Sequence, residues 1–383
     1  MRLVYLDNAA TTQVDPEVVQ AMMPFLTEHY GNPSSIHSLG RITRTAIEQA
    51  RKTVASLINA APSEIFFTSG GTEANNMAIC RSIEDLNIKH AITSGIEHHA
   101  VLHTLEALSK EGKIKLSLVA LDEQGKVDLA HLRYLLEQNE RSLVSLMHAN
   151  NEIATRLPIH EAARLVKEFN GIFHSDTVQT MGHFKIDVQQ TPVDFLNCAA
   201  HKFHGPKGVG FIYIRSGTGI HPFIHGGAQE RNMRGGTENL AGIVGLSKAL
   251  EISCQHMDEH TQHIRGIKSY MMEQLQHTFS DLRFNGDVSD DSLYTVLNVS
   301  FAPSDAGEML LFSLDINGIA ASGGSACSSG SEVGSHVLAA IGATAGRNNV
   351  RFSFSKNTTR DDIDYTIETL KKLLPELVST AHV

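Results

Sequence analysis

Short apolar runs alternate with helical patterns through most of the first 215 residues. Segments with helical periodicity, such as 128–139 and 158–169, lie between most of the apolar runs. This alternation predicts an α/β fold with a mainly parallel sheet flanked by helices. Seven strands are expected in that sheet, at 65–70, 90–97, 114–122, 142–150, 172–176, 194–200 and 209–215.

The two ends of the chain follow a different pattern. The opening residues predict a short strand and a loop, then a helix from Pro16 to Glu28 and an amphipathic helix that ends near Ile58, with Ser34 or Ser35 as its N-cap. A long helical segment covers 237–279, and strands and helices of a smaller unit follow it, at 295–301, 305–316, 351–354 and from 359 onward. We therefore expect a large domain of residues 15–255 and a small α+β domain of residues 1–14 and 256–383.

Composition limits the possible classes of protein. The formal net charge is −10, from 32 Lys and Arg against 42 Asp and Glu, which disfavours direct binding to nucleic acid or to an anionic membrane. No apolar run is long enough to span a bilayer, and the first residues lack the core of a signal peptide, so we expect a cytoplasmic protein. The 4 cysteines show no CxxC spacing and the 21 histidines no HEXXH motif, which argues against a metal site.

Polar residues that could catalyse a reaction or bind a ligand follow several predicted strands. In open α/β sheets, ligands bind outside the carboxyl ends of the strands. The residues expected at this edge are Gly70, Gly71 and Thr72 at the start of a helix, then His98, Asn150, Asn151, Asp176, Gln179, His201 and Lys202.

This set matches the needs of pyridoxal 5'-phosphate (PLP). A lysine forms a Schiff base with the cofactor, a carboxylate pairs with its pyridine nitrogen, and a helix N-terminus binds its phosphate. Taken singly, Gly70 and Gly71 suit a turn, Asp176 a helix cap, His98 a surface position and Lys202 a solvated one. Their coincidence at one edge favours the cofactor site. A nucleotide site is disfavoured because neither GxxxxGK[ST] nor GxGxxG is present.

Two residues near the C-terminal end complete the candidate chemistry. Cys327 lies in SGGSACSSGSEVG, a stretch too rich in glycine and serine to pack, so we expect an exposed loop whose thiol can enter a site and leave it. The alternative is an incidental cysteine in a flexible loop. Arg351 is a candidate to bind a substrate carboxylate, and the alternative for it is a surface ion pair.

With these residues in view, the chain resembles the cysteine desulfurases of the NifS/IscS type, in the fold-type I, class V aminotransferase group of PLP enzymes. The resemblance runs nearly end to end and preserves the order of the family's motifs. These motifs are YLDNAATT, GNPSSIH, FTSGGTEANN, EHHAVL, HANNEIA, SDTVQT, HKFHGPKGVG, RGGTEN, GSACSSG and RFSFSKNTT.

The resemblance implies a role for each candidate residue. Lys202 would carry the cofactor, Asp176 would pair with its ring nitrogen, and His98 would stack on the ring and assist proton transfer. Gln179 and Asn151 would contact the ring oxygen side, and Cys327 would accept sulfur. Phosphate would be bound by Gly71, Thr72 and His201, with Thr237 reaching it from the other subunit of a homodimer, and the substrate carboxylate by Asn32 and Arg351.

The implied reaction converts L-cysteine to L-alanine and leaves a persulfide on Cys327 for an acceptor protein such as an iron–sulfur scaffold. Two departures from the family stand out: Ala199 replaces a serine that usually binds the phosphate, and Ala154 replaces a glycine. The lost hydrogen bond at Ala199 would weaken cofactor binding by about 1.5–3 kcal/mol. The alternatives are a selenocysteine lyase or aminotransferase, and a sulfur-relay protein that has lost catalysis.

Overall fold

The computed structural model describes residues 2–304, 307–323, 334–343 and 346–379. Its centre is a seven-stranded sheet in which every predicted strand is present, with the order β2-β8-β7-β6-β5-β3-β4. Only β8 runs antiparallel to its neighbours, because the turn from β7 is too short for a helical crossover. The strands are β2 (Ile65–Thr68), β3 (His90–Thr93), β4 (Lys115–Leu118), β5 (Ser142–Ser145), β6 (Ile172–Ser175), β7 (Phe195–Ala199) and β8 (Gly210–Ile214). The predicted α/β fold class is confirmed.

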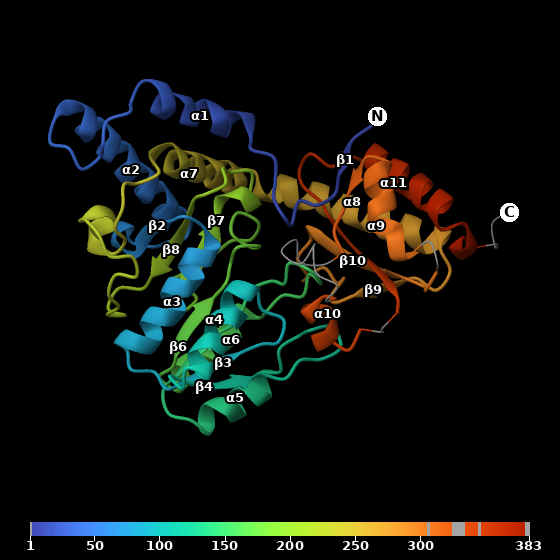
Figure 1. Ribbon diagram of the computed structural model, residues 1–383, viewed down its shortest axis with the longest axis horizontal. Helices are drawn as coiled ribbons and strands as arrows, with labels where there is room; N and C mark the ends of the chain where they lie inside the picture. The colour runs from blue at the N-terminus through green and yellow to red at the C-terminus, as the bar shows by residue number, and fades with distance from the viewer. Residues whose placement is uncertain (1, 305–306, 324–333, 344–345, 380–383) are drawn as a thin grey trace.

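Helices cover both faces of this sheet (Figure 1). Side chains alternate between the faces along each strand, so Ile65 and Phe67 of β2 belong to one core and Phe66 to the other. The first core includes side chains from α2 (Ser38–Leu57), α5 (Leu129–Glu137), α6 (Ile159–Glu168) and α7 (Leu240–Gln255), and α1 (Pro16–Thr27) packs on α7. The second core lies under α3 (Gly71–Asp85) and α4 (His99–Lys110). The parallel strands β3, β5, β6 and β7 are therefore buried on both sides, whereas the edge strand β4 is partly exposed.

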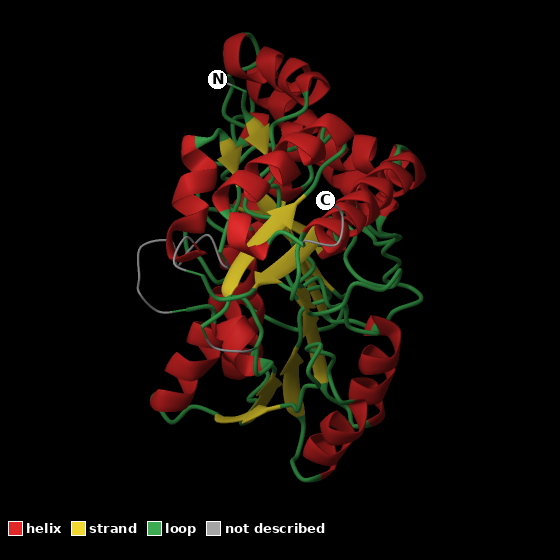
Figure 2. Cartoon of the chain, turned by 90° about the vertical axis from the view of Figure 1, so that its right-hand side faces the viewer, coloured by secondary structure: helices red, strands yellow, loops and turns green. Residues whose placement is uncertain are grey.

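A separate hydrophobic core lies in the C-terminal part, which occupies the right of Figure 1. It forms between α8 (Met257–Thr278), α9 (Leu310–Ile316), α11 (Arg360–Leu373) and an antiparallel sheet of order β12-β10-β9. The strands of that sheet are β9 (Arg283–Asn285), β10 (Val296–Phe301) and β12 (Asn348–Ser353), and α10 (His336–Ala340) lies nearby. Figure 2 shows the strands of this sheet among its helices.

The N-terminal segment packs with this C-terminal core. Val4 and Leu6 are buried in it, and β1 (Val4–Tyr5) pairs in parallel with β11 (Ile319–Ala320). The chain then crosses to the large sheet and passes the carboxyl ends of its strands before α1 begins at Pro16. Residues 8–12 therefore lie between the two cores.

One local prediction was wrong. The N-cap of α2 is His37, whose Nδ1 atom accepts a hydrogen bond from the Gly40 backbone, and neither Ser34 nor Ser35 caps this helix. The asparagine before them explains the difference, because Asn32 Oδ1 accepts from the Ser34 backbone N–H and closes its own turn. The helix accordingly begins three residues after Ser35.

Among the described residues, no helix is both long and apolar enough to cross a bilayer, and no three His, Cys, Asp or Glu side chains are placed to hold a metal ion.

Candidate active site

A cavity of about 240 Å³ lies at the carboxyl ends of the central strands and opens toward the C-terminal part. It brings together residues from the N-terminal segment, the large sheet and β12. Its lining is Ala9, Ala10, Gly71, Thr72, Asn75, His98, Met147, Asn151, Asp176, Val178, Gln179, Ala199, His201, Lys202 and Arg351. Most of the residues singled out from the sequence therefore meet in one place.

Lys202 enters the cavity because the chain leaves the sheet immediately before it. Strand β7 ends at Ala199, and residues Ala200–Lys202 form a single 3-10 turn. The Lys202 Nζ atom donates to the carbonyl oxygens of Ala9, at 2.6 Å, and Ala10, at 2.8 Å. The N-terminal segment thus holds the amine inside the cavity.

The N-terminus of α3 forms another wall. Its N-cap is Gly70, which has φ of 154° and no side chain to accept from the first-turn N–H groups. Gly71 has to be glycine, because a Cβ atom here would lie 2.7 Å from the Val178 Cγ2 atom. Uncapped N–H groups at a helix N-terminus attract an anion, so the first turn can hold a phosphate.

Asp176 follows β6 and is the acidic side chain of the cavity. It is buried, and its Oδ1 atom accepts from the Val178 backbone N–H at 2.9 Å. Gln179, three residues later, donates from Nε2 to the Ala9 carbonyl at 3.1 Å. Lys202 and Gln179 therefore share the Ala9 carbonyl as an acceptor.

His98 and His201 supply two half-buried imidazoles. His98 is the N-cap of α4, and its Nδ1 atom accepts from the Ala100 backbone N–H at 3.1 Å. Burial, opposed by Asp176 and reinforced by Lys202, lowers the pKa of His98. Burial beside Lys202 and Lys207 lowers the pKa of His201 to about 4. The His201 ring is therefore neutral at pH 7 and can act as a hydrogen-bonding group.

Arg351 lies at the edge of the cavity on β12 and is almost fully buried. It donates from Nη2 to Asp7 Oδ1 at 2.8 Å and from Nη1 to the Asn151 carbonyl at 3.0 Å. Its Nε atom is buried and has no hydrogen-bond partner among the described residues. A buried donor of this kind favours an incoming acceptor such as a carboxylate.

Gly70 and Asn150, both expected at this edge, do not line the cavity, and the Asn150 side chain instead bonds to the backbone of its own loop and of Ile96. Three residues to which the resemblance gave a role are also outside it. Asn32 is exposed in the turn before α2, and its side chain bonds to Ser34. Thr237 lines a different cavity together with Arg234 and Glu238. Cys327 lies outside the described residues.

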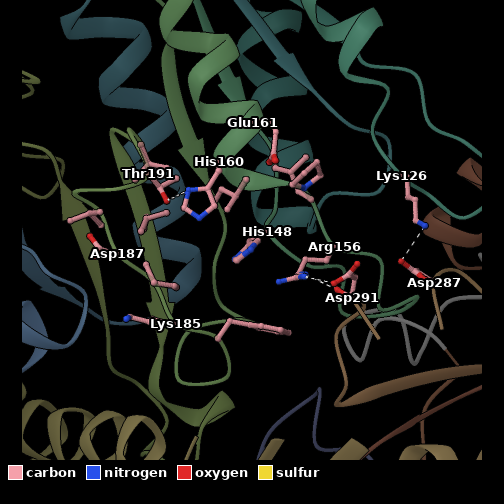
Figure 3. Close-up of a pocket in the computed structure, with 18 of the residues that line it drawn as sticks. Lys126, His148, Arg156, His160, Glu161, Lys185, Asp187, Thr191, Asp287 and Asp291 are labelled. Carbon is pink, nitrogen blue, oxygen red and sulfur yellow. Dashed lines mark hydrogen bonds and ion pairs between the residues drawn. The ribbon is translucent and has the colours of Figure 1, made fainter. Parts of the chain in front are cut away.

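A larger cavity of about 590 Å³ lies between α6 and the loop at Asp287–Asp291. Figure 3 shows its charged side chains, many of which pair with one another. Arg156 binds Asp291, Lys126 binds Asp287, and the His160 ring bonds to Thr191. This second cavity contains neither the lysine nor the uncapped α3 N-terminus of the first.

The model of the family described as aminotransferase class-V matches residues 4–366. The chain belongs to the class-V aminotransferase family. A protein named cysteine desulfurase IscS from Dictyoglomus turgidum is 47% identical over 380 residues, which cover 98% of this chain and 95% of that protein. The solved structure of a NifS-like protein matches with a TM-score of 0.91 and 38% identity over 98% of this chain and 100% of that one.

A third match carries a ligand in its title. The structure titled SspA in complex with cysteine has a TM-score of 0.79 and 32% identity, and covers 93% of this chain and 100% of that one. Class-V aminotransferases and cysteine desulfurases are PLP enzymes. The family predicted from the sequence motifs is therefore confirmed.

Sequence reasoning missed several residues of this class-V aminotransferase site. Ala9 and Ala10 act through backbone carbonyls, which carry no side-chain signal. Asp7 and Asn75 stood in quoted motifs, YLDNAATT and FTSGGTEANN, but received no role. For Asn75 the available signal was its place one helical turn after Gly71 in the predicted helix.

Proposed function

We propose that this chain is a PLP-dependent cysteine desulfurase. The observation that carries the proposal is the convergence of Lys202, Asp176, His98 and the uncapped α3 N-terminus in one cavity of a class-V aminotransferase fold. These groups fit the donor set that PLP requires: an amine for its aldehyde, a carboxylate for its pyridine nitrogen, and N–H groups for its phosphate.

In this proposal each lining residue has a defined task toward the cofactor. Lys202 would bind the aldehyde end of the cofactor, and Asp176 would pair with its ring nitrogen. His98 would contact the ring face, and Asn151 and Gln179 would contact the ring oxygen side. The phosphate is held by Gly71, Thr72 and His201, with Thr237 supplied by the second subunit of a homodimer. When bound, PLP stabilises negative charge at the carbons of an amino-acid substrate.

Substrate binding depends on Arg351. Its buried guanidinium has an unpaired Nε atom, and the substrate carboxylate would bind there and displace the Asp7 side chain. Asn32 is a second contact for this carboxylate, as part of the loop before α2. Such an anchor sets the direction of the L-cysteine side chain relative to Cys327.

Sulfur transfer uses Cys327 as the acceptor. Its thiolate attacks the sulfur atom of L-cysteine, the S–Cβ bond breaks, and a proton replaces sulfur at Cβ, which gives L-alanine and a persulfide on Cys327. His98 and Lys202 are placed to move protons at the substrate carbons. The persulfide then passes to an acceptor protein, such as an iron–sulfur scaffold, in the cytoplasm.

The decisive experiment measures alanine formed from L-cysteine with saturating PLP and a thiol reductant, for wild type and Cys327→Ser. The expected result is alanine from wild type and none from the variant, with unchanged cofactor content in both. Equal alanine from both proteins would contradict the role of Cys327 and favour a lyase. Cofactor binding without any alanine would favour another substrate, and the absence of cofactor binding would favour a relay protein.

A further inference from the structure

Behind Asp176, two buried asparagines form a row of hydrogen bonds. Asn75 lies on α3 and donates from Nδ2 to Asp176 Oδ2 at 2.7 Å. Asn197 lies on β7 and donates from Nδ2 to Asn75 Oδ1 at 2.8 Å. The Thr177 backbone N–H donates in turn to Asn197 Oδ1 at 2.9 Å. Asn75 is 1% exposed and Asn197 is 0% exposed, so water does not substitute for these contacts.

The direction of every hydrogen bond in this row is determined by its two ends. A backbone N–H can only donate, which makes Oδ1 of Asn197 the atom that faces Thr177. The Asn197 amide then presents Nδ2 to Asn75, whose Oδ1 accepts and whose Nδ2 points to Asp176. The last acceptor is an oxygen atom of the Asp176 carboxyl group, and an amide nitrogen that faces it can only donate. The row therefore delivers an N–H group to Asp176 Oδ2.

Both oxygens of the Asp176 carboxylate are held in this way. Oδ1 accepts from the Val178 N–H and Oδ2 from Asn75. Two hydrogen bonds, one to each oxygen atom, fix the plane of the carboxylate. Its remaining lone pairs are left for a group inside the cavity.

The row also joins the two ends of the cofactor cavity. Asn75 lies one helical turn after Gly71, so the same helix carries the proposed phosphate cradle and the donor to Asp176. Asn197 lies under this turn, with its Nδ2 atom 3.7 Å from the position that a Cβ on Gly71 would take. Helix α3 thereby sets the distance between the phosphate end and the ring-nitrogen end.

We propose that Asn75 and Asn197 are positioning residues that keep the Asp176 carboxylate aimed at the pyridine nitrogen of PLP. The inference rests on the proposed function, because it requires PLP in the cavity. Its specific content is that the two amides act on one atom of the cofactor, the ring nitrogen, through Asp176.

The test compares PLP with its 1-deaza analogue, in which a C–H group replaces the ring nitrogen and the aldehyde and phosphate remain. Dissociation constants for both are measured by equilibrium dialysis on the full-length apoprotein. For Asn75→Leu, which keeps the number and branching of the side-chain heavy atoms and removes the donor, we expect about tenfold weaker binding of PLP and unchanged binding of the analogue. Equal weakening for both compounds would show a merely structural role and overturn the proposal, as would unchanged PLP affinity.

Two further variants make the test decisive. Asn197→Ala retains the Asn75 donor but removes its support, so a smaller loss confined to PLP is expected even if Asn75→Leu folds poorly. Asn76→Ala is the matched control, since Asn76 neighbours Asn75 but bonds to the Thr72 carbonyl and to Thr104 instead of Asp176. It should change the two affinities by the same factor. Wild-type protein that binds neither compound would contradict the proposed function itself, which separates that failure from failure of the positioning role.

Discussion

The Arg351 Nη2 atom lies 2.8 Å from the Asp7 Oδ1 atom, at the edge of the candidate active site. The guanidinium is 1% exposed at its side chain and the carboxylate 20%. The N-terminal segment therefore places an internal carboxylate on the arginine that we assign to the substrate carboxylate. Asp7 and an incoming L-cysteine compete for the same donor.

Asp7→Asn is expected to lower the KM for L-cysteine, because a neutral amide competes less well for Arg351. A partly exposed ion pair contributes up to about 1 kcal/mol, so the fall is up to about fivefold. Arg351→Ala, assayed beside it, should raise KM by roughly 10- to 100-fold, since a charge-assisted contact contributes about 1.5–3 kcal/mol. Steady-state kinetics at saturating PLP measure both. A higher KM for Asp7→Asn would show that Asp7 orients Arg351 instead of competing for it.

Ala199→Ser should tighten cofactor binding. Ala199 lines the cavity beside the α3 N-terminus, where a hydroxyl can donate to a phosphate oxygen. A hydrogen bond to a charged group contributes about 1.5–3 kcal/mol, which is roughly 10- to 100-fold in the dissociation constant of PLP. Equilibrium dialysis of the apoprotein measures this dissociation constant. Pyridoxal, which lacks the phosphate, is the control ligand. An equal gain in affinity for pyridoxal would show that the new hydroxyl does not act on the phosphate.

Glu97 makes stability depend on pH. Burial, with Asp176 nearby, raises its pKa to about 8, and its Oε2 atom has no partner among the described residues. An unfolded glutamate titrates near about 4.3, so between pH 5 and 8 the folded state retains a proton that the unfolded state loses. Stability from this group is thus present at low pH and lost as pH rises through that window.

Glu97→Gln removes this loss, because glutamine does not titrate. The free energy of unfolding of the variant, minus that of wild type, should therefore rise by a few kcal/mol from pH 5 to pH 8, since each unit of pKa shift corresponds to about 1.4 kcal/mol. Urea unfolding at the two pH values measures the difference. The exposed Glu106→Gln provides the comparison and should show no such trend. A pH-independent difference for Glu97→Gln would mean that Glu97 is ionised in the folded protein.

Glu230→Gln should destabilise the fold strongly. Arg51 and Glu230 form a buried pair with contacts of 2.7 and 2.9 Å, and Glu230 also accepts from the Phe67 backbone. Removal of one partner from a buried pair costs about 3–5 kcal/mol. Glu48→Gln, which removes a partly exposed partner of Arg51, should cost at most about 1 kcal/mol. Urea unfolding distinguishes the two, and similar small losses would contradict the argument.

The same pair supports an unusual backbone. Glu230, Arg231 and Asn232 have φ of 42°, 55° and 64°, which side chains with a Cβ rarely adopt. This turn precedes Thr237, the proposed contact to the second subunit. Loss of the Glu230 anchor is therefore expected to release the turn as well as the ion pair.

The sheet could be predicted because each strand is a short apolar run bounded by a turn. Few secondary structures other than a buried strand fit such a run. The candidate site followed from side chains at strand ends, where geometry is common to all open α/β sheets. Contacts with backbone groups that lie far away in the sequence could not be predicted. The carbonyls of Ala9 and Ala10 beside Lys202 are an example. The prediction of the α2 N-cap was wrong because Asn32 forms its own turn with Ser34. The domain limits at residues 15 and 255, and the roles of all the candidate site residues, stay predictions.

The N-terminal segment also has a consequence for how the protein is made. Ala9 holds Lys202 from 193 positions away, and the Asn8 side chain donates to the Ser353 carbonyl, 345 positions later. On the ribosome, the Ala9 carbonyl has to wait for the second half of the chain to meet Lys202, and the Asn8 side chain waits for nearly the whole chain to meet Ser353. Contacts of such sequence separation form slowly. The central sheet has all its strands once Ile214 is made, whereas the cavity around Lys202 also needs Arg351 and is therefore completed much later.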